Sequence, residues 1–369
     1  MKNITKNTVI FLVSTLLCFL VLEALLRIYN PFQWRVKGDK IILPVNRKYI
    51  FDNDKIDKLD RKIIHSKNSL GFRGENPPKN FSDYLSIVIV GGSTAECFYL
   101  SDGRDWPYLV GQKLKNIYDK VWVNNAGLAG HSTFGHIILV NDYLTRLKPK
   151  IIIFEVGAND IGRDDLGKYD RVALKGRYSS FKNFIVKNSE VVSLLANMVR
   201  LAKAQKMGIT HRNLDVVKAD KLVLPEGNIE KEVNHHKSGY IDGYKKRLLQ
   251  LVDICRKNRI EPIFVTQPIL CGNTVDATTE VDLGDVKLSD SMNGNLCWRI
   301  MQVYNNATKE VAGRTGTFVI DLASEMPKDS RYFYDNWHYT NEGAEKVSQI
   351  VFEKLKNYLD VEYKANLKK

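Results

Sequence analysis

The chain has 369 residues, of which 44% are hydrophobic, and these values argue against disorder and allow one large globular domain. Its formal net charge is +13, from 55 basic and 42 acidic residues. The lysines are spread along the chain, and no zinc-finger spacing, RNA-binding aromatic motif or Walker loop occurs, so we expect no nucleic-acid partner. A basic surface suits an anionic membrane or an acidic glycan, and a solvated lysine-rich surface is the simplest interpretation.

Residues 1–34 are expected to form an N-terminal membrane anchor. The apolar stretch 9–26 approaches the ~20 residues that a transmembrane helix needs. Glu23 is costly in hydrocarbon, but Arg27 lies four residues later, where the two can pair on one helix face. A cleaved signal peptide is the alternative; because no A-x-A-like site follows, we expect an uncleaved anchor with the main domain outside the cytoplasm. Residues typical of the headgroup boundary come next: Tyr29, Phe32, Trp34, Arg35 and Lys37.

Residues 35–67 are polar and mixed, and we expect them to be a linker to a domain over 68–369. The segment 68–75 has two glycines and predicts a structured turn. Short apolar runs then predict buried strands at 85–90, 121–125, 151–156, 261–266 and 317–322. Segments with helical spacing lie at 106–118, 134–147, 240–258, 296–313 and 341–359, and Thr340 is placed to cap the last one.

This alternation of strand and helix predicts a parallel sheet with helices on both faces. Two insertions interrupt it. Residues 161–237 are expected to be partly helical, with an apolar stripe over 191–201, and residues 270–295 are polar and loop-like. In such sheets the ligand lies beyond the carboxyl ends of the strands.

Gly91-Gly92-Ser93-Thr94 follows the first strand and precedes a helix. Serine at a helix N-terminus lies where free backbone N–H groups favour a developing negative charge. Taken alone, the motif is equally explained by a tight turn in which Ser93 caps the helix.

Candidate hydrogen-bond donors follow the next two strands. Gly130, after the second strand, could offer its N–H to an oxyanion, and Asn159, after the third, could donate through its amide. Asp335 and His338 then precede the final helix. A neutral imidazole can take a serine proton while a carboxylate fixes its tautomer.

The ordered set Ser93, Gly130, Asn159, Asp335 and His338 resembles the SGNH (GDSL-type) hydrolase superfamily, over roughly residues 68–359. The resemblance implies a three-layer α/β/α, flavodoxin-like fold with a five-stranded parallel sheet. It also implies that Ser93 is the nucleophile, His338 the base and Asp335 the residue that orients it. The oxyanion hole would consist of the Ser93 and Gly130 N–H groups and the Asn159 side chain, and no cofactor is expected.

The chain departs from this family at one position. The family's first block is Gly-Asp-Ser-Leu, whereas Gly92 stands here in place of the aspartate, which removes an acceptor near Ser93. Many bacterial relatives with an N-terminal membrane segment share this feature.

The acidic and histidine residues outside these motifs are considered as metal ligands. No metal site is expected: the acidic cluster Asp160, Asp164 and Asp165 fits no calcium loop and is interpreted as a solvated turn. His211, His235 and His236 lack ligand spacing and are interpreted as surface residues.

Cys97 and Cys255 are expected in the core, and Cys271 and Cys297 could pair in an oxidising compartment. The candidates for the substrate pocket are Gly92, Thr94, His131, Gln267 and Pro268.

The main hypothesis is an ester hydrolase at the cell envelope, acting on acyl esters, including O-acetyl esters, of glycans or lipids. One alternative is an O-acyltransferase that passes the acyl group to a polysaccharide with the help of a membrane-protein partner. Another is a non-catalytic envelope-binding module that keeps the fold.

Overall fold

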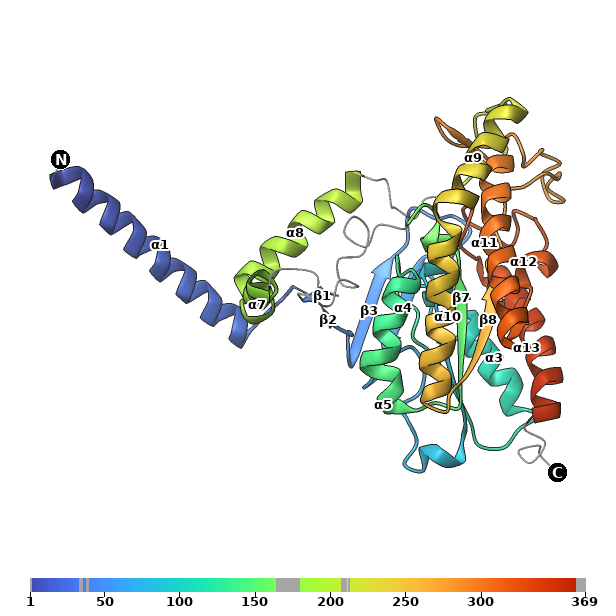
Figure 1. Ribbon diagram of the computed structural model, residues 1–369, viewed down its shortest axis with the longest axis horizontal. Helices are drawn as coiled ribbons and strands as arrows, with labels where there is room; N and C mark the ends of the chain where they lie inside the picture. The colour runs from blue at the N-terminus through green and yellow to red at the C-terminus, as the bar shows by residue number, and fades with distance from the viewer. Residues whose placement is uncertain are drawn as a thin grey trace. The chain divides into compact units, whose positions relative to one another are not determined.

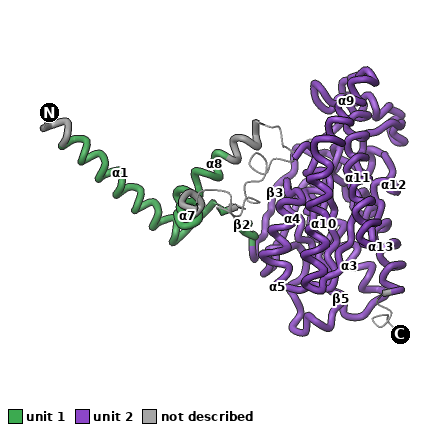
Figure 2. The backbone as a smooth tube through the Cα atoms, viewed as in Figure 1, with its two compact units in different colours: residues 1–44, 170–210 green, residues 45–169, 211–369 purple. Residues whose placement is uncertain are grey.

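The computed structural model describes residues 2–32, 36–37, 40–163, 180–206, 211 and 213–362. The chain divides into two compact units (Figure 2). Unit 1 consists of residues 1–44 and 170–210, and unit 2 of residues 45–169 and 211–369.

The centre of unit 2 is a five-stranded parallel sheet, as the sequence predicts. Its spatial order is β11-β8-β7-β5-β6, and every neighbouring pair is parallel. The strands are β5 (Leu85–Val90), β6 (Val121–Asn125), β7 (Ile151–Val156), β8 (Glu261–Thr266) and β11 (Phe318–Ile320). Four of the five have the bounds expected from the sequence, because strands buried on both faces are continuous apolar runs.

Helices cover both faces of this sheet (Figure 1). Alternate strand residues such as Ile87, Ile153 and Val265 share one core cluster with α3 (Trp106–Lys115) and α13 (Asn341–Glu362). The other face is covered by α4 (Thr133–Leu139), α10 (Ile241–Lys257) and α11 (Gly294–Thr315). The predicted three-layer α/β/α architecture is confirmed.

Polar side chains cap the N-termini of two of these helices, α3 and α13. Asp105 accepts a hydrogen bond from the Tyr108 N–H at 3.3 Å at the start of α3. Thr340 Oγ1 accepts one from the Gly343 N–H at 3.0 Å at the start of α13, which confirms it as the cap.

The expected linker differs from the structure. Residues from 45 onward belong to unit 2, where β3 (Arg47–Asp52) and β4 (Lys62–Lys67) form an antiparallel pair. Every second residue of β4 is buried, including Lys67, which pairs with buried Glu96 at 3.2 Å. Some buried positions of residues 45–67 hold charged side chains that are paired. For this reason the segment resembles a polar linker in sequence although it is part of the folded unit.

The insertions also contain regular elements. In residues 161–237 these are α7 (Ser180–Asn188), α8 (Glu190–Lys206) and α9 (Glu226–Gly239); residues 164–179, 207–210 and 212 lie outside the described residues. In residues 270–295 they are β9 (Lys287–Ser289) and β10 (Met292–Asn293), which pair. The remaining short elements of unit 2 are η1 (Phe81–Asp83), α2 (Ser93–Glu96), η2 (Val140–Leu144), α5 (Thr145–Leu147), η3 (Ala158–Asp160) and α12 (Leu322–Glu325).

Unit 1 contains α1 (Lys2–Ile28), the short strands β1 (Val36–Lys37) and β2 (Lys40–Ile41), and helices α7 and α8. Residues Lys6–Ile28 of α1 are long and apolar enough to cross a membrane.

Candidate active site

Ser93 lies at the carboxyl end of β5, as the first residue of α2. The turn into α2 is tight, since a Cβ atom on Gly91 would lie 2.6 Å from the Cβ of Ala95. The backbone N–H groups of Glu96 and Cys97 donate to the carbonyls of Gly92 and Ser93 at 3.0 and 2.9 Å. These contacts fix the backbone that carries the Ser93 hydroxyl, and the Ser93 side chain itself is partly exposed.

The loop before α13 brings Asp335 and His338 to Ser93. Asp335 Oδ2 lies 2.7 Å from His338 Nδ1, and His338 Nε2 lies 2.7 Å from Ser93 Oγ, although Ser93 and His338 are 245 positions apart in the chain. An Nδ1–H that donates to the carboxylate leaves Nε2 as the acceptor for the Ser93 hydroxyl. The three side chains therefore form one continuous hydrogen-bonded chain.

Asp335 also organises its own loop. Its Oδ1 accepts hydrogen bonds from the N–H groups of Trp337 and His338, both at 2.8 Å. Burial by itself would raise the pKa of Asp335, but attraction to His338 and these hydrogen bonds lower it on balance. A carboxylate is thus held at the imidazole.

Asn159 and Gly130 follow β7 and β6, the two strands that flank β5. A Cβ atom on Gly92 would lie 2.2 Å from Asn159 Nδ2, so the amide nitrogen lies directly against the turn that carries Ser93. Gly130 has φ +78°, and a Cβ there would meet nothing within 4 Å, so its backbone is open to a ligand. Both donors are thus on the edge of the sheet where Ser93 lies.

A buried carboxyl braces the Ser93 turn in place of the aspartate that the family motif would supply. Glu155, on β7, accepts hydrogen bonds from Thr94 Oγ1 at 2.9 Å and from the Tyr339 hydroxyl at 3.0 Å. Thr94 follows Ser93, and Tyr339 follows His338, so Glu155 connects the two segments that carry Ser93 and His338. Burial raises the pKa of Glu155 to about 7, although the hydrogen bond from Thr94 opposes the shift.

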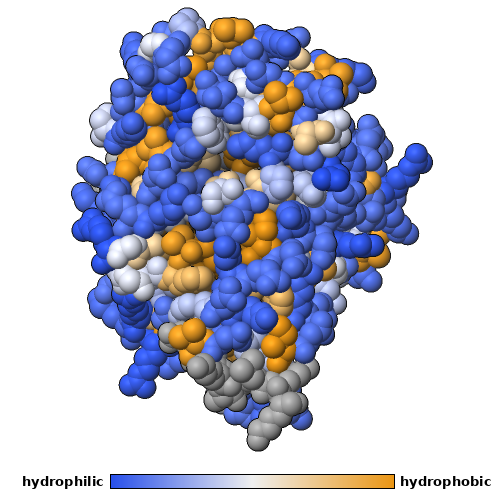
Figure 3. Space-filling model, turned by 90° about the vertical axis from the view of Figure 1, so that its right-hand side faces the viewer, coloured by the Kyte–Doolittle hydropathy of each residue, from blue (hydrophilic) through white to orange (hydrophobic). Residues whose placement is uncertain are grey.

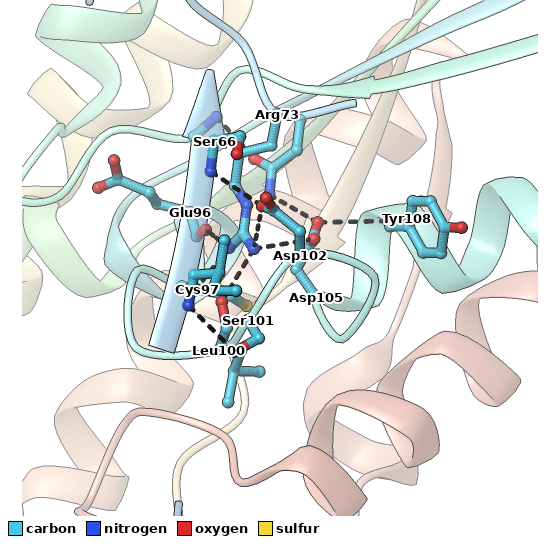
Figure 4. Close-up of polar contacts among 12 residues, drawn as sticks. Ser66, Arg73, Glu96, Cys97, Leu100, Ser101, Asp102, Asp105 and Tyr108 are labelled. Carbon is cyan, nitrogen blue, oxygen red and sulfur yellow. Dashed lines mark hydrogen bonds and ion pairs between the residues drawn. The ribbon is translucent and has the colours of Figure 1, made fainter. Parts of the chain in front are cut away.

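Arg73 holds the other end of α2 (Figure 4). Its guanidinium donates to the carbonyls of Glu96 and Cys97 at 2.9 and 2.6 Å, and to that of Leu100 at 2.9 Å. It also pairs with buried Asp105 at 3.4 Å. A cation at a helix C-terminus satisfies carbonyls that have no partner within the helix. The 68–75 segment was predicted as a turn, and sequence reasoning missed that it supports the Ser93 helix.

The interpretation of Asp160 as a solvated residue is wrong. Asp160 is 1% exposed, accepts from Thr133 Oγ1 at 2.5 Å and pairs with Arg247 at 3.3 Å. Because Asp160 directly follows Asn159, this buried ion pair anchors the η3 turn. Asp164 and Asp165 lie outside the described residues.

The interpretation of His211 as a surface residue is also wrong. Its ring centroid lies 4.1 Å from that of His338, and its Nδ1 lies 2.7 Å from the Tyr334 hydroxyl. Burial lowers the pKa of His211 to about 4, so its imidazole is neutral at neutral pH. His236 is buried against Tyr304, whereas His235 is exposed as expected.

One group of described side chains has the geometry of possible metal ligands. The ligand atoms of His211, Asp335 and His338 lie within 4.8 Å of one another. Both ring nitrogens of His338 already face hydrogen-bond partners, Asp335 and Ser93. This set is therefore fully accounted for as a hydrogen-bonded chain with a packed histidine beside it.

The pocket candidates divide into two groups. In the first group, a Cβ on Gly92 would lie 2.2 Å from Asn159 Nδ2 and 3.4 Å from the carbonyl oxygen of His131, so Gly92 and the His131 backbone lie beside Asn159. Thr94 and Gln267 are buried, and Thr94 Oγ1 lies 3.1 Å from Gln267 Oε1. Gln267 and Pro268 also line a hollow with Trp298 and Lys328.

The five cysteines are free thiols in this structure, including Cys271 and Cys297, so the suggested pairing is not formed. Cys97 and Cys255 are buried, as expected of core residues. Burial raises the pKa of Cys255, Cys271 and Cys297 to about 12, which disfavours the reactive thiolate.

The match to a protein-family model places this chain among the esterases. The chain belongs to the GDSL-like lipase/acylhydrolase family, whose model matches residues 89–346. No curated protein sequence matches the chain.

Several solved structures are similar to the chain at low sequence identity. An acetylxylan esterase from Geobacillus stearothermophilus has 14% identity and a TM-score of 0.43, over 73% of this chain and 93% of that one. A GDSL-like lipase from Bacteroides thetaiotaomicron has 10% identity and a TM-score of 0.40, over 77% and 93%. An alpha/beta hydrolase from the metagenome of Lake Arreo has 14% identity and a TM-score of 0.42, over 74% and 96%.

Proposed function

We propose that the protein is a serine ester hydrolase of the cell envelope, with Ser93 as nucleophile, His338 as general base and Asp335 as the residue that orients His338. The observation that carries this proposal is the unbroken hydrogen-bonded chain from Asp335 through His338 to Ser93, with both contacts at 2.7 Å.

In the first step, Ser93 Oγ attacks the carbonyl carbon of the ester while His338 Nε2 takes its proton. The Ser93 and Gly130 N–H groups and the Asn159 amide donate to the resulting oxyanion. The imidazolium then gives its proton to the departing alkoxide, and an acyl-serine ester remains. Water attacks this ester with His338 again as base, which releases the carboxylic acid and restores Ser93.

The N-terminal helix supports a location at the membrane. Residues Lys6–Ile28 have the length and apolar character of a span, and we propose that they anchor the protein with unit 2 outside the cytoplasm. Proteolysis of intact spheroplasts tests this orientation: unit 2 should be digested, and full protection would contradict the proposal.

The hydrolase is tested with the full chain in detergent and short-chain aryl esters. Ser93→Ala and His338→Ala should each abolish turnover, and Ser93→Ala should also prevent labelling by a fluorophosphonate. Ser291→Ala and His235→Ala, at exposed positions, are the matched controls and should keep full activity. A folded Ser93→Ala protein with full activity would contradict the mechanism.

An ester panel from acetyl to long acyl chains, together with acetylated glycans, identifies the substrate class. The same reactions carried out with a sugar acceptor distinguish hydrolysis from acyl transfer. We expect free acid as the product; an acylated sugar formed at the expense of free acid would favour the transferase.

A further inference from the structure

Unit 1 has an unusual surface. Most of the large apolar side chains that are exposed in the described part of the chain belong to it, although it is the smaller unit. By contrast, the face shown in Figure 3 is mainly hydrophilic, with apolar residues in small separate groups. A membrane span accounts for the exposed side chains of α1, but α8 also exposes Leu195 (57%), Met198 (53%) and Val199 (56%).

Helix α8 combines buried polar side chains with exposed apolar ones. Its buried described side chains are Ser193 (3% exposed), Asn197 (6%) and Val191 (6%), and Asn197 Nδ2 donates to the Ser193 carbonyl at 2.8 Å. In water, a helix turns its apolar face inward. Polar groups that are satisfied inside a helical contact, with apolar side chains outside, are typical of helices in lipid.

The start of α8 is fixed to α1 by one carboxylate. Glu23 accepts hydrogen bonds from Ser189 Oγ at 2.8 Å and from the N–H groups of Glu190 and Val191 at 3.0 and 3.1 Å. Arg27 Nε also donates to it at 2.8 Å. Glu23 therefore caps α8 at its positive end, and its charge is satisfied close to the apolar segment.

The length of α8 sets how deeply it can enter a membrane. Its apolar part, Glu190–Val199, is too short to cross a bilayer, which needs ~20 residues. It starts beside Glu23, near the end of the Lys6–Ile28 span, where Tyr29 and Phe32 follow with 74% and 46% exposure. Aromatic residues at that level suit the membrane–water boundary.

We propose that the apolar face of α8, with exposed Phe184 of α7 (63%), inserts into the phospholipid surface beside α1. This inference rests on the proposed membrane anchor. The insertion helices are then a second membrane contact, held to the span by Glu23 and lying along the interface.

Photo-crosslinking to lipid tests this with the full chain. The protein is reconstituted in vesicles of phosphatidylethanolamine and phosphatidylglycerol that contain a lipid with a diazirine in its acyl chain, and tryptic peptides are analysed by mass spectrometry. Cleavage after Lys187 and Arg200 yields peptide 188–200 from α8, and cleavage after Lys6 and Arg27 yields peptide 7–27 from α1. We expect lipid adducts on both peptides.

Two variants define the surface. Leu195→Gln with Met198→Gln should lower the lipid adducts on peptide 188–200 by about tenfold or more and leave those on peptide 7–27 unchanged. Val217→Gln with Val223→Gln, at valines of unit 2 that are 64% and 75% exposed, is the matched control and should change neither.

The outcomes separate this inference from the proposed function. Adducts on peptide 7–27 alone would overturn the role of α8 and leave the anchor intact, and absence of adducts on both peptides would overturn both. Absence of lipid adducts on peptide 188–200, together with disulfide-linked dimers of a Leu195→Cys protein that the wild type does not form, would show that a second chain covers this face and would also overturn the inference. Ester turnover in the same vesicles reports on the hydrolase independently.

Discussion

Replacing Glu155 by glutamine changes the charge of the buried network under the Ser93 turn with little change of shape. The Glu155 carboxyl is 1% exposed, and burial raises its pKa to about 7 from 4.5. A raised pKa means that the folded state favours the protonated acid. The contribution of protonated Glu155 to the free energy of unfolding is fully present below pH 4.5 and is lost as the pH rises through about 7. Since one pKa unit corresponds to about 1.4 kcal/mol, ionisation lowers the free energy of unfolding by ~3 kcal/mol.

The hydrogen bonds explain why glutamine should fit. Thr94 Oγ1 lies 2.9 Å from Glu155 Oε2 and 3.1 Å from Gln267 Oε1, but a hydroxyl has one proton and can donate to only one of them. The Glu155 carboxylate accepts from Thr94, whereas the protonated acid can donate to Thr94 instead; Thr94 then donates to Gln267, and each of these groups has a partner. A glutamine amide reproduces this pattern and stays neutral at every pH.

Urea unfolding of the full chain in detergent, followed by tryptophan fluorescence, measures the effect. Between pH 5 and 8 the wild type should lose ~2–3 kcal/mol relative to Glu155→Gln. Glu230→Gln, at an exposed position of α9, is the matched control and should follow the wild type. If the difference between wild type and Glu155→Gln stays constant over this range, Glu155 is not the titrating group and the reasoning fails.

Three further substitutions probe the contacts around the site. Arg73→Met leaves buried Asp105 without its cation and should cost ~3–5 kcal/mol in urea unfolding, and an unchanged midpoint would argue against the brace. His211→Ala removes the ring packed on His338 and should lower kcat about tenfold with KM little changed; an effect on KM alone would indicate substrate contact instead. Thr340→Ala removes the cap of α13 and should cost ~1 kcal/mol, with faster amide exchange in its first turn than in α11.

The sequence predicts the sheet well because its strands are buried on both faces, and such strands consist mainly of continuous apolar runs. It predicts the β3–β4 hairpin poorly because Lys67 and His65 are buried there, and a charge that is buried through pairing with Glu96 cannot be distinguished from a solvated one. The burial of Asp160 could not be predicted for the same reason, because its partner Arg247 is 87 positions away in the chain.

The site divides in a similar way. Ser93 and His338 stand in motifs with a family resemblance, so they could be proposed before any distance was known. Arg73, Glu155 and His211 stand in no such motif, and their roles depend on contacts between distant segments. A local cue existed only for Glu155, as a single acidic residue within an apolar strand: such a charge needs a buried partner or a raised pKa.

Gly92 stands where the family motif has aspartate, and the structure indicates that a side chain there would be harmful. A Cβ at this position would lie 2.2 Å from Asn159 Nδ2, a distance that side-chain carbons do not tolerate. Gly92→Ala should therefore displace the Asn159 amide and lower kcat by ~10²–10³, as expected for the loss of one oxyanion donor. Gly92→Asp, which restores the motif, should be no more active. Gly313→Ala, where an added Cβ meets nothing within 4 Å, is the matched control and should keep full turnover. Wild-type activity in a folded Gly92→Ala protein would mean that Asn159 does not contribute to the oxyanion hole, because the two groups cannot occupy the same space.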